Sequence, residues 1–233
     1  ESLCDNSLME YINHNNLENM TSRYRAQIIN SLSGFKSANL IGTCSNDNIN
    51  NLAMFSSVFH LGSSPALVGF ITRPDSVERH TLDNIKQTKQ FTINQVNDSF
   101  WQAAHQTSAR YSTEECEFKK TGLTVETIDG VNAPFVKESR LKYALVLQEI
   151  IPLQLNGTLL IIGEITNIIC DKAAIKDDGY IDIESLNTVM VSGLDSYHTS
   201  KRLSRLSYAK PNNKPIRLAL NGKPESILIE NID

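Results

Sequence analysis

Side chains that could bind a ligand gather between residues 51 and 94 of the 233-residue chain. Ser56 and Ser57 lie in a strand-like run, while Arg79 and Thr81 stand just before a short helical pattern. Hydroxyls and backbone amides at a strand end, together with an arginine at a helix start, are groups that hold a phosphate. The pattern therefore predicts a phosphate-binding site.

Simpler explanations of the same residues stay open. Adjacent side chains of an ideal strand point to opposite faces, so Ser56 and Ser57 could be ordinary strand serines. Their backbone amides could still face a ligand. Thr81 is also a good helix N-cap, with Asn84 three residues later where a capping box would be completed, and Arg79 would then be a surface residue.

Catalytic motifs give no further candidate. The chain contains no dinucleotide fingerprint, P-loop, nucleophile elbow or zinc-binding HExxH sequence. His105 has no carboxylate close to it in the sequence, so we expect a structural histidine rather than a general base. We predict neither a catalytic side chain nor a metal site, although a nicotinamide nucleotide that visits transiently is compatible with these absences.

Composition narrows the class of protein. A net charge of −4 argues against nucleic acid as a partner, because surfaces that follow phosphates are usually basic. The longest apolar run, residues 157–169, is interrupted by Glu164 and Thr166, so we expect no membrane span. The four cysteines are scattered and the first residues lack a signal-peptide pattern, which together predict a cytoplasmic protein.

The secondary-structure pattern predicts a mainly β chain. Asn156-Gly157 between two apolar runs is a strong hairpin signal, and residues 37–45 and 52–59 form a second predicted hairpin. An antiparallel barrel with peripheral helices fits this pattern best. The remaining predicted elements are strands at 66–72, 91–96, 123–128, 141–152 and 157–169, and helices at 82–88 and 99–107.

The order of these segments resembles the flavin reductase-like FMN-binding proteins, which have a split β-barrel fold. The segments that carry the resemblance are NLAMFSSVF, the strand ending in FITRP, RHTLDNI, FTIN, AHQTSARYSTEECEF with TGLTVE, and DGYIDIESLNTVMVSGLDSYH with RLSYAKP. The resemblance spans residues 23–211 and leaves 1–22 as an N-terminal extension and 212–233 as a C-terminal tail. The basic segment 196–211 departs from many shorter members, and its role is open.

The resemblance implies a homodimeric, NAD(P)H-dependent flavin reductase that binds FMN without a covalent bond, near the subunit interface. NADH or NADPH would be the transient reductant, and a protein could be the electron acceptor. By position, Asn51, Ser56, Ser57 and Val58 would line the isoalloxazine and ribityl chain, Arg79, Thr81 and Asn84 would contact the phosphate, and His105, Thr107 and Ser108 would lie near the open face of the ring, in the same or the partner subunit.

Two alternatives remain at this point. The chain could be an FMN-binding electron carrier, similar to flavoredoxins, that does not itself turn over NAD(P)H. The same barrel could also bind haem or a deazaflavin, although Arg79 and Thr81 at the phosphate end favour FMN.

Overall fold

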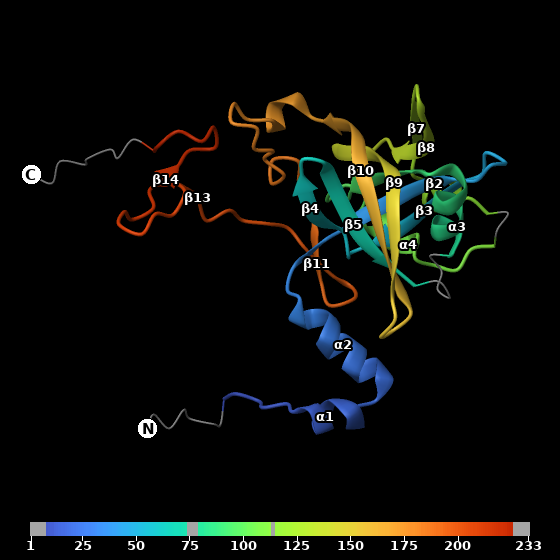
Figure 1. Ribbon diagram of the computed structural model, residues 1–233, viewed down its shortest axis with the longest axis horizontal. Coiled ribbons are helices and arrows are strands. Elements are labelled where there is room, and N and C mark those ends of the chain that lie inside the picture. The colour runs from blue at the N-terminus through green and yellow to red at the C-terminus, as the bar shows by residue number, and fades with distance from the viewer. Residues whose placement is uncertain (1–7, 74–78, 113–114, 226–233) are drawn as a thin grey trace, which may run out of the picture.

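The computed structural model describes residues 8–73, 79–112 and 115–225. Its main sheet has seven antiparallel strands in the order β3-β2-β6-β9-β10-β5-β4, which confirms the predicted split β-barrel (Figure 1). These strands are β2 (Asn39–Cys44), β3 (Asn50–Phe55), β4 (Phe59–Ser63), β5 (Ala66–Thr72), β6 (Gln90–Gln95), β9 (Leu141–Leu153) and β10 (Thr158–Cys170).

The predicted hairpins are both present. β2 pairs with β3, and β9 pairs with β10 around the Asn156-Gly157 turn, where Gly157 adopts a φ of 71° that favours glycine. The predicted strand at 66–72 coincides with β5. Local sequence patterns were sufficient for these elements because each hairpin pairs segments that are neighbours in the chain.

The predicted strand at residues 52–59 is wrong. The chain forms two strands, β3 and β4, and these lie at opposite edges of the seven-stranded sheet. Residues 56–58 connect them and therefore cross the gap between the two edges. We call these three residues the crossing segment.

The interior consists of two apolar clusters. One fills the barrel and is built around Phe70, Phe91 and Leu145. The other includes Leu40 and Phe118, and lies where α4 (Trp101–Gln106) and α5 (Glu117–Thr121) cover β3. The hairpin of β7 (Val125–Ile128) and β8 (Val131–Val136) packs against β2 and β6, and α3 (Arg79–Thr88) packs against β2 and β3.

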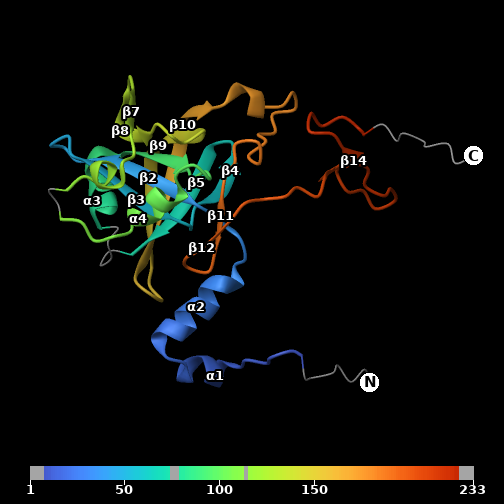
Figure 2. The ribbon, with the colours of Figure 1, turned by 180° about the vertical axis from the view of Figure 1, so that it is seen from behind.

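The described N-terminal helices and the C-terminal hairpin extend away from the barrel (Figure 1 and Figure 2). The N-terminal helices α1 (His14–Asn19) and α2 (Ser22–Leu32) contain no buried residue. The remaining elements are a small sheet of β1 (Lys36–Ser37), β11 (Met190–Ser192) and β12 (Ser196–His198), the short helix η1 (Lys172–Ala174), and the hairpin of β13 (Arg205–Leu206) and β14 (Arg217–Leu218). In the described ranges, no helix combines the length and the apolar character needed to cross a membrane.

Candidate functional site

A pocket with a cavity volume of about 670 Å³ lies beside the crossing segment. We call it the serine pocket. Ser56, Ser57 and Val58 form one wall, and other walls come from Ile71 at the end of β5 and from the junction between α2 and β1. The structure thus places three of the predicted site residues together in one cavity.

The Ser57 side chain is occupied by the barrel itself. Its hydroxyl donates to the Ile71 carbonyl and accepts from the Ile71 amide, both at 3.1 Å. In this way it joins the crossing segment to β5, while the Ser37 hydroxyl donates to the Val58 carbonyl at 3.4 Å from the other side. Within the described ranges, the backbone amides of Ser56, Ser57 and Val58 make no hydrogen bond. They are therefore the donors that this wall offers.

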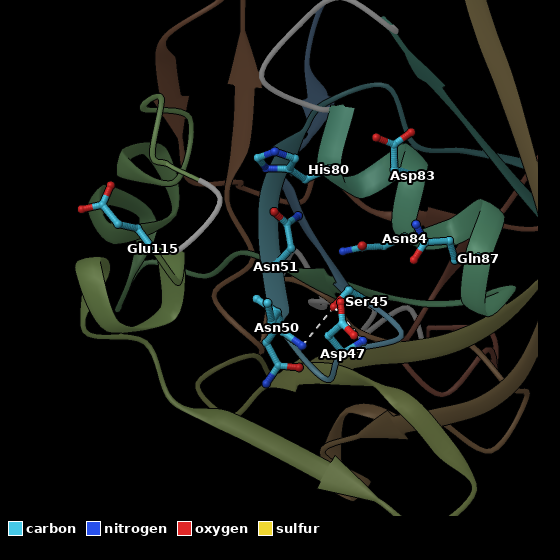
Figure 3. Close-up of a pocket in the computed structure, with 10 residues that line it drawn as sticks. Ser45, Asp47, Asn50, Asn51, His80, Asp83, Asn84, Gln87 and Glu115 are labelled. Carbon is cyan, nitrogen blue, oxygen red and sulfur yellow. Dashed lines mark hydrogen bonds between the residues drawn. The ribbon is translucent and has the colours of Figure 1, made fainter.

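A second pocket, of about 240 Å³, lies between β3, α3 and the turn that joins β2 to β3. We call it the asparagine pocket (Figure 3). Asn51 faces it from β3, and the Asn84 side chain points toward it from α3. Asn84 also donates to the Thr43 hydroxyl at 3.0 Å, which fixes the position of its amide. Ser56, Ser57 and Val58 therefore line one pocket, whereas Asn51 and Asn84 line the other.

A buried polar network lies next to the asparagine pocket. The Asn51 amide lies between the Thr81 hydroxyl, at 3.0 Å, and the Glu117 carboxylate of α5. All three groups are satisfied when Asn51 Nδ2 donates to Glu117 Oε1 at 3.2 Å and Asn51 Oδ1 accepts from the Thr81 hydroxyl. Glu117 Oε2 also accepts from the Leu52 amide at 3.2 Å, on the edge of β3 that has no strand neighbour.

Glu117 is the titratable group of this network. Burial raises the pKa of its carboxyl above the ordinary value, although the hydrogen bond from the Leu52 amide and the nearby His80 act in the opposite direction. The Glu117 carboxylate accepts from the Leu52 amide and from the Asn51 side chain, so it holds α5 against β3. Glu117 therefore acts on the pocket by positioning Asn51.

The start of α3 differs from the prediction. The helix begins at Arg79, so Thr81 is a buried residue within its first turn and not the N-cap. The predicted N-cap role of Thr81 is wrong because the helix starts three residues before the predicted position. The Arg79 guanidinium is exposed and lies 3.7 Å from Asp83. Arg79 and Thr81 line neither pocket.

Carboxylates make the asparagine pocket unsuitable for a phosphate. Asp47, Asp83 and Glu115 all line it. Like charges repel, so these carboxylates oppose the binding of a phosphate in this pocket. Among the described residues there is no group of three or more potential metal ligands.

The three residues predicted near the ring's open face lie around the end of α4 and line neither pocket. His105 Nδ1 is 2.9 Å from the Tyr197 hydroxyl of β12. The Thr107 hydroxyl is buried and donates to the Ala104 carbonyl at 2.7 Å, while Ser108 is exposed. Within one copy of the chain, the His105 side chain therefore interacts with Tyr197 and the Thr107 side chain with Ala104.

In a comparison with known protein families, residues 32–184 match the family model described as a flavin reductase like domain. This match covers more than half of the chain. The chain belongs to the flavin reductase-like family. The family assignment agrees with the order of segments from β3 through α3 to α5, and it confirms the resemblance found in the sequence.

Solved structures of similar fold include a protein of Shewanella frigidimarina that is provisionally described as a flavin reductase with a split barrel domain. It is 50% identical, with a TM-score of 0.84, over 86% of this chain and 100% of that one. Flavoredoxin of Desulfovibrio vulgaris is 24% identical, with a TM-score of 0.63, over 77% of this chain and 92% of that one, and shares the fold. An uncharacterised protein of Aquifex aeolicus is 31% identical over 48% of this chain. The matched region spans 58% of that relative's length.

Two residues beside the site, His80 and Glu117, were not among the predicted site residues. His80 lines the asparagine pocket, and Glu117 holds Asn51. In the sequence both lie in polar stretches where a charged side chain normally faces solvent. The acidic-Phe pair at Glu117 and Phe118 within the family resemblance was the available signal.

Proposed function

We propose that this flavin reductase-like protein binds FMN with the ring against the crossing segment and the phosphate near Arg79, and that it works as an NAD(P)H-dependent flavin reductase. The observation that carries the proposal is that residues 56–58, whose backbone amides have no hydrogen bond within the described ranges, line a cavity of about 670 Å³. This volume is within the usual range for cofactor sites.

The residues present fit this cofactor. Amide donors beside a flavin ring orient it and tune its electronics. The Ser57 hydroxyl is engaged with Ile71, so the ring contact falls to the amides and not to this side chain. The exposed guanidinium of Arg79 at the start of α3 supplies a charged donor for a phosphate, and the positive end of the helix dipole lies beside it.

Bound FMN would supply the hydride-accepting chemistry, so the protein needs no acid or base of its own for that step. Its contribution would be positioning and exclusion of water. The Ser57 bonds fix the wall, and the network of Glu117, Asn51 and Thr81 fixes the edge of β3, the strand that leads into the crossing segment. His105 has no part in this scheme within one copy of the chain.

We also propose a homodimer. Phe35, Phe59 and Leu61 are exposed by 64%, 41% and 40%, and the first two line the serine pocket. Apolar side chains around a pocket that binds a ring are a surface that a second subunit would cover. This would also complete the exclusion of water from the ring. The cytoplasmic location and a protein electron acceptor remain expectations.

The test is the visible absorption spectrum of the purified protein, followed by anaerobic titration with NADH and then NADPH. We expect a flavin spectrum, in the protein as isolated or after addition of FMN, and bleaching by at least one nucleotide. A protein that neither carries nor takes up FMN would contradict the proposal. Bound FMN that neither nucleotide reduces would support the electron carrier instead.

A further inference from the structure

The C-terminal arm, which we define as residues 199–225, presents apolar side chains to solvent. Leu203, Leu206 and Tyr208 are exposed by 98%, 61% and 89%, and Ile216 is exposed by 52%. Figure 1 shows the arm, with β13 and β14, extending away from the barrel. Each of these two strands has two residues, which is too short for a hairpin that is stable by itself.

The base of the arm is nevertheless held firmly. Arg202 forms an ion pair with Asp182, and Arg205 Nη2 lies 2.5 Å from Asp178 Oδ2. The Arg205 guanidinium also lies over the Tyr180 ring, 4.3 Å from its centroid. The bond from Arg205 lowers the pKa of Asp178 below its ordinary value. We call this group, with Arg202, Arg205, Asp178, Tyr180 and Asp182, the arginine clamp.

The clamp determines which side of the arm is free. Arg202 and Arg205 turn toward the body and are half-buried, whereas Leu203 and Leu206 beside them are exposed. Within the described ranges, the side-chain hydrogen bonds and ion pairs between the arm and the body all end on residues 178–184.

Charge indicates what the free side would contact. Residues 199–225 contain seven Lys or Arg and one Glu, a net charge of +6. The whole chain has a net charge of −4, so the rest of it carries −10. A basic arm and an acidic body are complementary, and in a second copy of this chain each arm would find an acidic body.

The chain also exposes enough surface to form an interface with a second copy. The chain exposes 15560 Å², whereas a compact monomer of 26.0 kDa exposes about 10,500 Å². If the 22 residues outside the described ranges are each assigned about 160 Å², the value for a fully exposed chain, an excess of about 1,500 Å² remains. Each partner of a standard-size interface buries roughly 800 Å².

We propose that the C-terminal arm of one copy docks on the acidic body of a second copy, with Leu203, Leu206 and Tyr208 buried between them and the arginine clamp aiming the arm. The arm is thus an exchanged element of a homodimer. This inference does not depend on FMN, because it concerns residues outside both pockets.

The direct test uses isotopes to separate contacts within a copy from contacts between copies. Full-length protein grown in ¹⁴N and in ¹⁵N is mixed, subunit exchange is verified by intact mass spectrometry, and a carbodiimide joins lysines to nearby carboxylates. We expect light–heavy cross-links from Lys210 or Lys214 to carboxylates of residues 8–198. Arm cross-links found only within light or only within heavy copies would overturn the proposal, since the arm would then lie on its own body.

A variant tests the apolar contacts. Leu203→Ala/Leu206→Ala/Tyr208→Ala changes only exposed side chains, so the fold should remain intact by circular dichroism. We expect at least a tenfold higher dimer dissociation constant in sedimentation equilibrium and loss of the light–heavy arm cross-links. The matched control, Leu8→Ala/Met9→Ala/Tyr11→Ala, changes side chains that are 84%, 79% and 83% exposed and should retain those cross-links.

Three results would contradict the proposal: a wild-type monomer at micromolar concentration, an arm variant with an unchanged dissociation constant and unchanged cross-links, or a monomer whose arm binds heparin or anionic vesicles. Flavin uptake is measured separately on the same samples. Failure of the arm proposal and failure of the flavin proposal are therefore distinguishable.

Discussion

The Ser57 hydroxyl makes two hydrogen bonds to a single residue, donating to the Ile71 carbonyl and accepting from the Ile71 amide, both at 3.1 Å. These bonds cross the gap between the edges of the barrel, because Ser57 follows β3 while Ile71 belongs to β5. A serine side chain thus replaces a strand pairing at the position where the backbone leaves the sheet. The wall of the serine pocket depends on it.

Ser57→Ala should lower the free energy of unfolding by about 1–3 kcal/mol, because two half-buried backbone groups of Ile71 lose their partner. FMN affinity should also fall, since the amide wall is no longer fixed to β5. Urea denaturation and flavin titration measure the two effects. Ser56→Ala is the control and should change stability by less than about 0.5 kcal/mol. Equal stability of the two variants would show that the Ser57 bonds are not needed.

Glu117→Gln should change how stability depends on pH. Burial raises the pKa of Glu117 above its ordinary value of 4.5. The folded protein therefore holds this proton more tightly than the unfolded chain, and the contribution of Glu117 to stability falls as pH rises from about 4.5 through the folded pKa. The glutamine can still accept from the Leu52 amide but does not titrate.

The measurement for Glu117 is the difference in unfolding free energy between wild type and Glu117→Gln at several pH values. Wild type should gain stability relative to the variant as pH falls through this window. A difference that is constant with pH would mean that Glu117 has the same pKa in the folded and unfolded states.

The antiparallel hairpins could be predicted because each of them pairs segments that are neighbours in the sequence. The Asn156-Gly157 turn and the apolar run of β5 are local patterns, and both were located correctly. The break after Phe55 could not be predicted in this way. Residues 52–59 form a mostly apolar run that is interrupted only by Ser56 and Ser57, and only the pairing of β4 with β5 on the far edge of the sheet shows that two strands are present.

The site could be predicted only in part for a similar reason. Ser56, Ser57 and Val58 were found because they are adjacent in the chain and therefore share a pocket. The partners of Asn51 are distant in sequence, since Thr81 comes from α3 and Glu117 from α5. Burial of Glu117 is a tertiary effect, and a polar stretch gives no sign of it.

Gly42→Ala should be strongly destabilising. A Cβ at this position would lie 2.2 Å from the Pro134 carbonyl oxygen and 2.6 Å from the Thr92 hydroxyl. The β8 backbone would have to move away from β2, at a cost of about 1–3 kcal/mol or more. Thermal and urea denaturation give this cost. At Gly62, where the nearest atom would be 3.4 Å away, alanine should be tolerated, and similar losses for both variants would contradict the close approach.

Arg79→Ala separates ligand binding from stability. Its guanidinium is exposed and its pair with Asp83 is a surface ion pair, so removing it should change the unfolding free energy by less than about 1 kcal/mol. A charge-assisted bond to the FMN phosphate should contribute about 1.5–3 kcal/mol, so the dissociation constant should rise by roughly ten- to a hundredfold or more. Fluorescence titration with FMN and, in parallel, with riboflavin measures it. Riboflavin lacks the phosphate, so its affinity should not change.

Lys86→Ala is the matched control for Arg79, because Lys86 is an exposed cation in the last turn of the same helix. It removes one positive charge from α3 without altering the start of the helix, where Arg79 lies. Its FMN affinity should therefore remain close to that of wild type. If Arg79→Ala and Lys86→Ala weakened FMN binding equally, the effect would be one of net charge, and the phosphate would have to be placed elsewhere than at Arg79.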